Sequence, residues 1–205
     1  LQRAGFSVTL YDENGLAQGC SKGNAGHFAT EQVFPLAHPS LITKLPAMLL
    51  NPLGPLRIDW RHAFKAIPWF WLFMKNMHKD TYRANSEALK ALNHDAINAY
   101  ERLLNEYNLG YLLTKKGSLL TFEKTPMVQI MNLLNSYQAQ GIAVDLLNAD
   151  QVKALEPNLA NTITHALMFK DVAHSVDPHL FCLNLAEQFS ALGGQFCQRK
   201  ITAIK

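Results

Sequence analysis

Residues 19–27 read Gly-Cys-Ser-Lys-Gly-Asn-Ala-Gly-His, and the assignment of the fold starts from this stretch. It follows an apolar run at 8–11, Val-Thr-Leu-Tyr, which is typical of a buried strand and leads directly to Asp12. Glycines let main-chain N–H groups turn toward an anion, and the short side chains of Ser21 and Asn24 add hydrogen-bonding groups. A strand, an acidic residue and a Gly/Ser-rich turn in this order are compatible with a nucleotide site. An ordinary surface turn has the same composition, so both interpretations stay open on these residues alone.

The composition is that of a folded globular protein. A chain of 205 residues, 48% hydrophobic and 17% charged, can bury a substantial core. The formal net charge of +3 is small and the basic residues are dispersed, which argues against a nucleic acid partner. Cys20, Cys182 and Cys197 are far apart and form no Cys-x-x-Cys pair, which favours a reducing compartment. The histidines show no zinc-type spacing, so we expect no metal site.

Residues 1–12, followed by 19–27, resemble the FAD-dependent oxidoreductases of the D-amino acid oxidase superfamily, with bacterial D-amino acid dehydrogenases as the nearest subgroup. In that family a first strand and a Gly-x-Gly-x-x-Gly turn precede a helix that ends much as Leu1 to Gly5 does here. These 205 residues contain no such turn. We therefore expect a chain that is truncated at both ends.

Later segments follow the family's order as well: Gly-Ser-Leu at 117–119, Leu-Glu-Pro at 155–157 and Val-Asp-Pro-His at 176–179. The resemblance implies a mixed α+β and α/β fold. A partial FAD-binding Rossmann-like domain would join a substrate domain with an antiparallel sheet and helices. The implied domains are 1–35 (partial FAD-binding domain), 36–175 (substrate-binding domain with a helical insertion) and 176–205 (return into the FAD-binding domain).

The resemblance also implies contacts with FAD. Asp12, at the end of its strand, would accept hydrogen bonds from ribose hydroxyls, although it would equally serve to start the turn Asp-Glu-Asn-Gly. Asn24 to His27 would run beside the flavin ring, where His27 would tune the flavin, contact substrate or only orient the loop. The main chain of Ile201 would hold the adenine. The predicted cofactor-binding residues are Asp12, Cys20, Ser21, Asn24, Ala25, Gly26, His27 and Ile201. No catalytic residue is assigned, because the family's carboxylate-binding residues often lie later in the chain.

The function implied by the resemblance is oxidation of the C–N bond of an amino acid or secondary amine, as in D-amino acid dehydrogenases. Two alternatives stay open: a sarcosine-, glycine- or proline-type amine oxidase, and a folded but inactive piece, mostly substrate domain, without bound cofactor. The implied partners are an amino acid or amine substrate and an electron acceptor such as a membrane quinone. The expected location is the cytoplasm, with peripheral contact to the inner membrane as an option.

An apolar helix is predicted at 63–77, with Lys65, Lys75 and Lys79 in and beside it. It is shorter than the roughly 20 residues that a membrane-spanning helix needs. Core packing is the simpler interpretation, and contact with a membrane surface is the other.

Hydrophobic periodicity, caps and turn residues predict the remaining elements. Gly5 is the predicted stop of the first helix, Thr125 and Asp177 are predicted N-caps, and residues 148–151 are close to a capping box. Five prolines should break 34–60 into short helices and loops, and a hairpin should turn at Lys115-Lys116-Gly117. One helix should cover 86–107, with an apolar stripe that includes Leu92 and Leu104. The predicted helices are at 1–5 (last turn only), 41–50, 125–141, 148–156 and 177–192, and the predicted strands are at 7–12, 111–114, 118–122, 142–146, 162–170 and 195–204.

Overall fold

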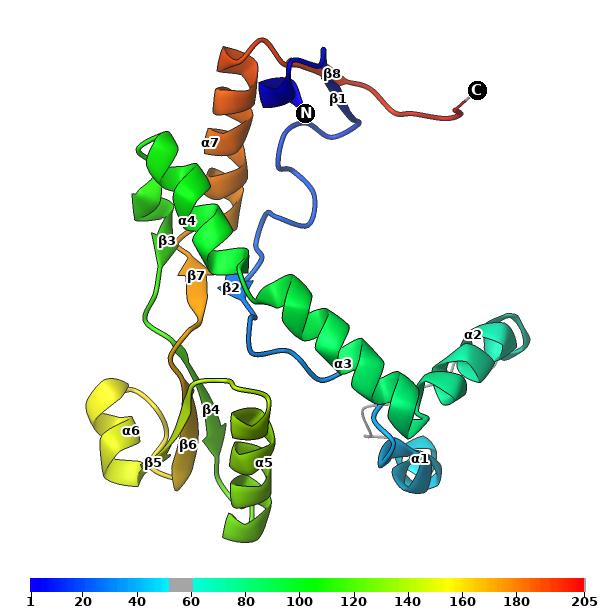
Figure 1. Ribbon diagram of the computed structural model, residues 1–205, viewed down its shortest axis with the longest axis vertical. Coiled ribbons are helices and arrows are strands. Elements are labelled where there is room, and N and C mark those ends of the chain that lie inside the picture. Colours follow the sequence, from blue (N-terminus) through cyan, green and yellow to red (C-terminus); the bar gives the residue numbers. More distant parts are fainter. Residues whose placement is uncertain (52–60, 205) are drawn as a thin grey trace. The chain divides into compact units, whose positions relative to one another are not determined.

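The computed structural model describes residues 1–51 and 61–204 (Figure 1). The chain folds into two compact units, one made of Leu1–Glu31 with Ala96–Lys205 and the other of Gln32–Asp95. The predicted mixture of helices with parallel and antiparallel sheets is confirmed. The predicted boundaries between cofactor and substrate domains stay a prediction.

The first sheet of the larger unit is a parallel pair. The short 3-10 helix η1 (Gln2–Ala4) ends at Gly5, which has the left-handed φ of 85° that the sequence predicts for a helix stop. Strand β1 (Thr9–Asp12) then pairs with β8 (Gln195–Gln198), from Thr9 opposite Gln195 to Asp12 opposite Gln198. Strand β8 is shorter than the predicted 195–204, because β1 turns away after Asp12 and leaves the following residues without a ladder partner in the described sheet.

Two antiparallel sheets follow. The order β2-β7-β3 joins β2 (His27–Phe28), β7 (Ala173–Ser175) and β3 (Leu113–Thr114), and the order β4-β6-β5 joins β4 (Ser118–Phe122), β6 (His165–Phe169) and β5 (Val144–Asn148). Strands β2 and β7 were not predicted, since neither contains enough residues for an alternating pattern.

The predicted hairpin at Lys115-Lys116-Gly117 is wrong. Strand β3 pairs with β7 and strand β4 pairs with β6, so these three residues carry the chain onward from one sheet to the next. Gly117 has a φ of 76°, and its N–H donates to the carbonyl of Val172 at 3.3 Å. Gly117 therefore lies at a bend where two antiparallel segments of the chain run side by side from one sheet to the other. The turn residues alone do not distinguish this bend from a hairpin.

Two helices of the larger unit begin at their predicted N-caps, and a third begins one residue later than predicted. Helix α6 (Ala149–Leu155) begins with a capping box between Asn148 and Gln151. Helix α7 (Pro178–Ala191) begins at Asp177, whose Oδ1 accepts the N–H groups of His179 and Leu180 at 2.8 and 3.1 Å. Helix α5 (Met127–Ala139) has Pro126 rather than the predicted Thr125 at its N-cap, because the Pro126 carbonyl accepts the first helical N–H groups. Helices α5 and α6 lie beside the sheet β4-β6-β5 (Figure 1).

The predicted helix at 86–107 is wrong as a single element. The chain forms α3 (Lys79–Asn93) and α4 (Ala96–Glu106), with a turn at His94-Asp95 between them. Asn93, His94 and Asp95 are weak helix formers, because short polar side chains compete for main-chain hydrogen bonds. This turn is also the boundary between the two compact units. Leu92 of the predicted apolar stripe is accordingly 77% exposed, whereas Leu104 is fully buried.

The smaller unit contains α1 (Leu41–Leu50), α2 (Ala63–Asn76) and α3. Its buried side chains include Val33, Ala37 and Met77, and the buried Ser86 of α3 donates to the Val33 carbonyl at 2.8 Å. Helix α1 has the limits that the sequence predicts. Residues 52–60 of the segment that was predicted to form short helices and loops lie outside the described residues.

The core that supports the second sheet is built from α4, α7 and the segment before β3. Leu104, Leu109, Leu112 and Phe181 are buried together. Phe28 of β2 packs its ring against those of Tyr100 and Phe181, with centroids 5.0 and 6.1 Å away. This aromatic contact fixes β2, and therefore the residues just before it, against α4 and α7.

Candidate functional site

The carboxylate of Asp12 closes the turn after β1. Its Oδ1 accepts the N–H groups of Asn14 and Gly15 at 2.7 and 3.2 Å, as the turn interpretation expects. The main chain of Asp12 accepts the N–H of Arg199 at 2.9 Å, so the residues just before Ile201 lie at the same end of the parallel pair. Ile201 is 52% exposed there. Ligands of parallel sheets bind at this carboxyl end of the strands, which is where Asp12 and Ile201 were predicted to act.

The Gly/Ser-rich stretch is attached to helix α7. The Cys182 thiol donates to Ser21 Oγ at 3.3 Å, and His179 Nδ1 lies 2.9 Å from the Ala17 carbonyl, to which it donates. Cys20 is exposed. A Cβ built on Gly19 or on Gly23 would meet no atom within 4 Å, so the main chain is open to an approaching group at both positions.

Asn24, Ala25 and Gly26 form a tight turn against β7. Asn24 Oδ1 accepts the Gly26 N–H at 2.8 Å, and the Gly26 carbonyl accepts the Ser175 N–H at 2.7 Å. Gly26 is buried with a φ of 73°, while Ala25 beside it is exposed. The turn delivers the chain directly into β2, so it fixes where the His27 side chain lies.

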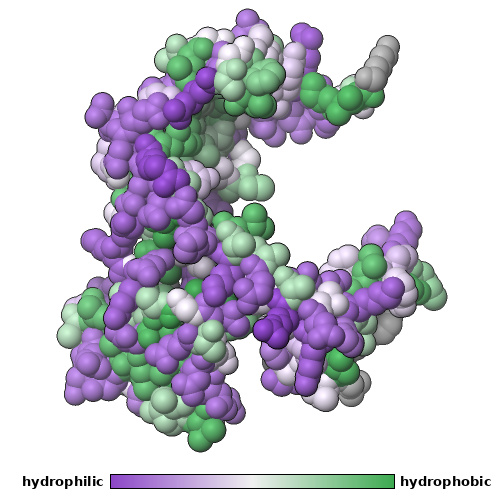
Figure 2. Space-filling model, viewed as in Figure 1, coloured by the Kyte–Doolittle hydropathy of each residue, from purple (hydrophilic) through white to green (hydrophobic). Residues whose placement is uncertain are grey.

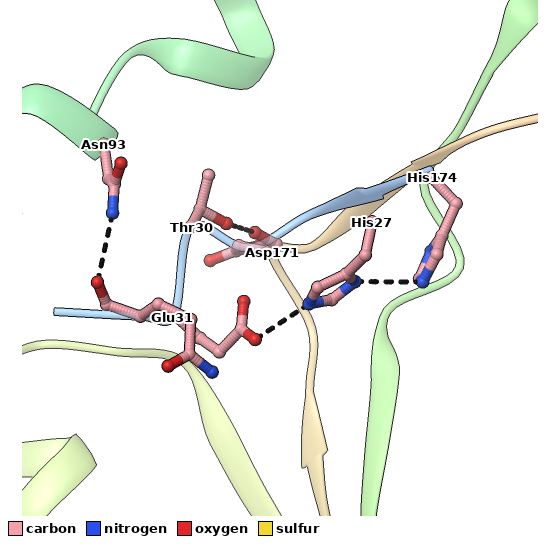
Figure 3. Close-up of polar contacts among 7 residues, drawn as sticks. His27, Thr30, Glu31, Asn93, Asp171 and His174 are labelled. Atoms are coloured by element: carbon pink, nitrogen blue, oxygen red, sulfur yellow. Dashed lines mark hydrogen bonds and ion pairs between the residues drawn. The ribbon is translucent and has the colours of Figure 1, made fainter. Parts of the chain in front are cut away.

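His27 is the centre of a polar chain (Figure 3). Its Nδ1 lies 3.0 Å from Nε2 of His174, which stands opposite it in the β2–β7 ladder. Its Nε2 lies 2.9 Å from Oε1 of Glu31, whose side chain is only 5% exposed. The hydroxyl of Thr30 donates to the Asp171 carbonyl at 2.7 Å and so holds the Glu31 segment against the link between β6 and β7.

The surroundings of this polar chain shift the pKa values of two groups, His174 and Tyr137. Burial lowers the pKa of His174 below its usual 6.5, the neighbouring His27 lowers it further, and the Glu31 carboxylate opposes this by raising it. Burial also raises the pKa of Tyr137 on α5, and the Glu31 charge adds to that increase. Tyr137 therefore keeps its proton over the physiological range, and neutral His174 is favoured near neutral pH.

Of the predicted site residues, the structure brings Ser21, Asn24, Gly26 and His27 into one segment held against α7 and β7, and it places Asp12 and Ile201 together at the end of β1 and β8. Glu31 and His174 were missed. A carboxylate four residues after a histidine was a usable local signal for Glu31. His174 is 147 residues from His27, and no pattern along the chain connects them.

The described residues contain no group of three or more His, Cys, Asp or Glu side chains arranged to hold a metal ion. They also contain no helix that is both long and apolar enough to cross a bilayer.

The chain matches the family model for FAD dependent oxidoreductases (DAO) over residues 1–205. A family of this kind is expected to contain helices, parallel strands and a Gly-rich turn after a strand, and the chain has these features. The chain belongs to this FAD-dependent oxidoreductase family.

Among curated relatives, it is 29% identical to D-amino-acid oxidase of Bradyrhizobium diazoefficiens over 206 residues, covering 99% of this chain and 49% of that protein. It is 27% identical to D-amino acid dehydrogenase 2 of Ralstonia nicotianae over 198 residues, covering 94% of this chain and 46% of the relative. The chain thus spans about half the length of the curated relatives it matches.

Solved structures show the same fold. Glycine oxidase from Bacillus cereus superposes with a TM-score of 0.58 at 17% identity, covering 100% of this chain and 43% of that one. L-alpha-glycerophosphate oxidase from Mycoplasma pneumoniae, solved with FAD bound, gives a TM-score of 0.51 at 21% identity, covering 96% and 40%.

The residues present fit part of an FAD site. An open main chain at Gly19 and Gly23 suits close approach of a ligand, and an exposed acidic residue at the end of β1 suits a ribose. Each of the eight predicted contacts with FAD stays a prediction.

Proposed function

We propose that the intact protein is an FAD-dependent oxidoreductase that oxidises the C–N bond of an amino acid, with D-amino acids as the first substrate class to test. The observation that carries the proposal is the family match along the whole chain, with two curated relatives that are named for D-amino acids. The similarity to glycine oxidase supports the fold of this chain but says nothing about its substrate, because the sequence identity is only 17%.

In this proposal Asp12 and Ile201 hold the adenosine part of FAD, and Cys20 and Ser21 line the path toward Asn24–His27 beside the flavin. The bound flavin would supply the hydride acceptor for the carbon next to the substrate nitrogen. The loop itself contributes fixed main-chain groups, because Asn24 and Gly26 are tied to each other and Gly26 is tied to Ser175. Substrate oxidation leaves an imine, which water hydrolyses to a keto acid and ammonia.

The experiment is anaerobic reduction of the purified, flavin-loaded protein. Loss of the flavin absorbance near 450 nm is followed with a panel of D-amino acids, their L-enantiomers, glycine, sarcosine and both prolines. Bleaching by D-amino acids supports the proposal, and bleaching only by glycine or sarcosine would instead assign an amine oxidase. Failure of every substrate to bleach a fully loaded flavin would contradict C–N oxidation altogether.

We further propose that the electron acceptor is a membrane quinone and that helix α2 brings a cytoplasmic protein to the inner membrane surface. Among the described residues α2 has no buried residue, which supports the membrane-surface interpretation of this helix over core packing. Phe64 is 84% exposed, and Trp69 and Trp71 are 56% and 58% exposed. Figure 2 shows hydrophobic surface in the part of the molecule that holds α1 and α2.

The charges on α2 complement an anionic bilayer. Residues 63–76 contain Lys65 and Lys75 and no acidic residue, and the Lys75 ammonium lies 3.8 Å above the Trp71 ring. Exposed aromatic rings together with lysines are typical of helices that lie in the headgroup region. The dehydrogenase relative is compatible with an acceptor other than oxygen.

The test is sedimentation with vesicles of phosphatidylglycerol and phosphatidylethanolamine. Wild type should sediment with anionic vesicles, and Trp71→Glu should weaken binding by roughly tenfold or more, since burial of one large apolar side chain is worth about 1.5–3 kcal/mol. Val128→Glu, at a 70% exposed site on α5, is the matched control and should bind as wild type does. Wild type that stays in the supernatant at every lipid composition would rule out the membrane contact.

A further inference from the structure

The Glu31–His27–His174 chain has a defined direction of hydrogen bonding. The Glu31 carboxylate can only accept, so the His27 Nε2 that lies 2.9 Å from it carries the hydrogen. In neutral His27 the other ring nitrogen, Nδ1, is then an acceptor. The 3.0 Å contact from this atom to His174 Nε2 therefore requires the hydrogen on His174 Nε2.

The remaining nitrogen is the outer end of the chain. With its hydrogen on Nε2, neutral His174 has a lone pair on Nδ1, and no described residue donates to that atom. Thr114, opposite His174 in the β3–β7 ladder, donates its hydroxyl to the main-chain carbonyl of His174 at 3.4 Å and not to the ring. The outer nitrogen of His174 is thus ready to accept one proton, while the inner end of the chain is a buried carboxylate.

We propose that Glu31, His27 and His174 form a one-proton relay, with Nδ1 of His174 as its entry and Glu31 as its internal acceptor. A proton that binds Nδ1 of His174 displaces the proton on its Nε2 to Nδ1 of His27. The proton on Nε2 of His27 then passes to Oε1 of Glu31. One N–H bond is made and one broken on each imidazole, one O–H bond forms on Glu31, and the charge of the set changes from −1 to zero.

Tyr137, Lys115 and Asp171 are ionisable groups on elements next to the relay. Burial and the Glu31 charge raise the pKa of Tyr137, so its hydroxyl stays protonated and neutral when a proton enters the relay. Lys115, which follows β3, is paired with Glu101 at 2.8 Å, and Asp171 of the β6–β7 link is exposed. Burial and His27 lower the pKa of His174 and the Glu31 carboxylate only partly opposes them, so His174 is neutral and its Nδ1 is an acceptor before a proton enters.

The use of the relay rests on the proposed function. An amino acid reaches the enzyme as an ammonium ion, and it must lose a proton from nitrogen before hydride leaves the adjacent carbon. A chain that accepts one proton at a neutral imidazole is suited to that step. In this step His174 takes the proton, His27 passes it on, and Glu31, which sets the starting tautomer of both rings, acts on the substrate only through the two imidazoles.

The test is histidine ¹⁵N NMR of the intact, flavin-loaded protein without substrate, so its outcome is separate from that of the activity assay. At neutral pH both His27 and His174 should give the Nε2–H pattern, with Nδ1 unprotonated. Glu31→Gln should lower the His174 pKa and mix the tautomers of both rings, because a neutral amide can either donate to or accept from His27. Asp145→Asn removes a charge on β5, where Asp145 pairs with Lys170, and should leave both rings unchanged.

Should Glu31→Gln not fold, His27→Gln provides the same information, since it breaks the link and should release His174 from the single Nε2–H form. An Nδ1–H form on either ring of the wild type, or unchanged His174 signals in both variants, would overturn the relay. A relay that passes these measurements in a protein that oxidises no amine would leave the assignment of tautomers standing and refute only its use in amine oxidation.

Discussion

Gly26 and Ser175 are joined so closely that residue 26 has no room for a side chain. The Ser175 N–H donates to the Gly26 carbonyl at 2.7 Å, and a Cβ on residue 26 would lie 2.7 Å from the Ser175 carbonyl oxygen. With its φ of 73°, Gly26 also occupies a conformation that L-residues avoid. This contact positions β2 next to β7 and thereby sets the distance between His27 and His174.

Gly26→Ala should therefore destabilise the protein and separate the two imidazoles. The left-handed φ alone costs about 1–2 kcal/mol, and the clash with main chain adds to it. Gly23→Ala, at a φ of 78° with no neighbour within 4 Å, is the matched control that carries the conformational cost without the clash. Urea unfolding of the two variants measures the difference, and equal losses of stability would contradict the steric argument.

Asp177→Ala should shorten helix α7 at its first turn. The Asp177 carboxylate accepts two helical N–H groups, and loss of an N-cap costs about 0.5–2 kcal/mol. Asp177→Asn keeps an acceptor oxygen and should lose little. Thermal unfolding distinguishes the two, and because His179 of this turn donates to Ala17, limited proteolysis within 13–25 should be faster in the alanine variant. Equal cleavage of all three proteins would argue against a link between the cap and the loop.

The features that were predicted correctly depend on residues close together in the chain. Gly5, the Asn148–Gln151 box and Asp177 each act within a single turn, so the sequence carries the complete signal for them. The turn at Asp12 belongs to the same class, and its four residues were sufficient to suggest it.

The features that were missed depend on distant partners. Phe169 and Val172 decide whether Gly117 closes a hairpin or lies at a bend between two sheets. They lie more than fifty residues further along the chain, in the segment that runs beside Gly117. His174 likewise becomes part of the candidate site only because β7 pairs with β2. Short strands such as β2 carry little pattern of their own, so their pairing is set by tertiary contacts.

Folding stability should decrease below about pH 6.5 in part because of His174. Its pKa is lowered in the folded state, so between that value and its ordinary 6.5 the unfolded chain binds more protons than the folded one. Stability from this group is therefore complete above pH 6.5 and is lost as the pH falls through the lowered folded value. His174→Gln should show a shallower decrease of the unfolding free energy over this range in urea titrations. A variant as steep as wild type would show that His174 does not contribute, and the difference between the two proteins should be constant above pH 8.

Glu31→Gln should change the pH dependence of substrate-dependent flavin reduction in the intact protein. The Glu31 charge raises the His174 pKa, so its removal should move the acid limb of the rate profile to lower pH. The plateau rate should fall by up to about 10²-fold, the lower end of what a positioned base contributes, while substrate binding changes little. Stopped-flow reduction at saturating substrate separates the rate from binding, and Asp145→Asn, which removes a charge on β5, should keep the wild-type profile. An acid limb that does not move in Glu31→Gln, in a protein that still reduces its flavin, would show that the proton leaves the substrate by another route.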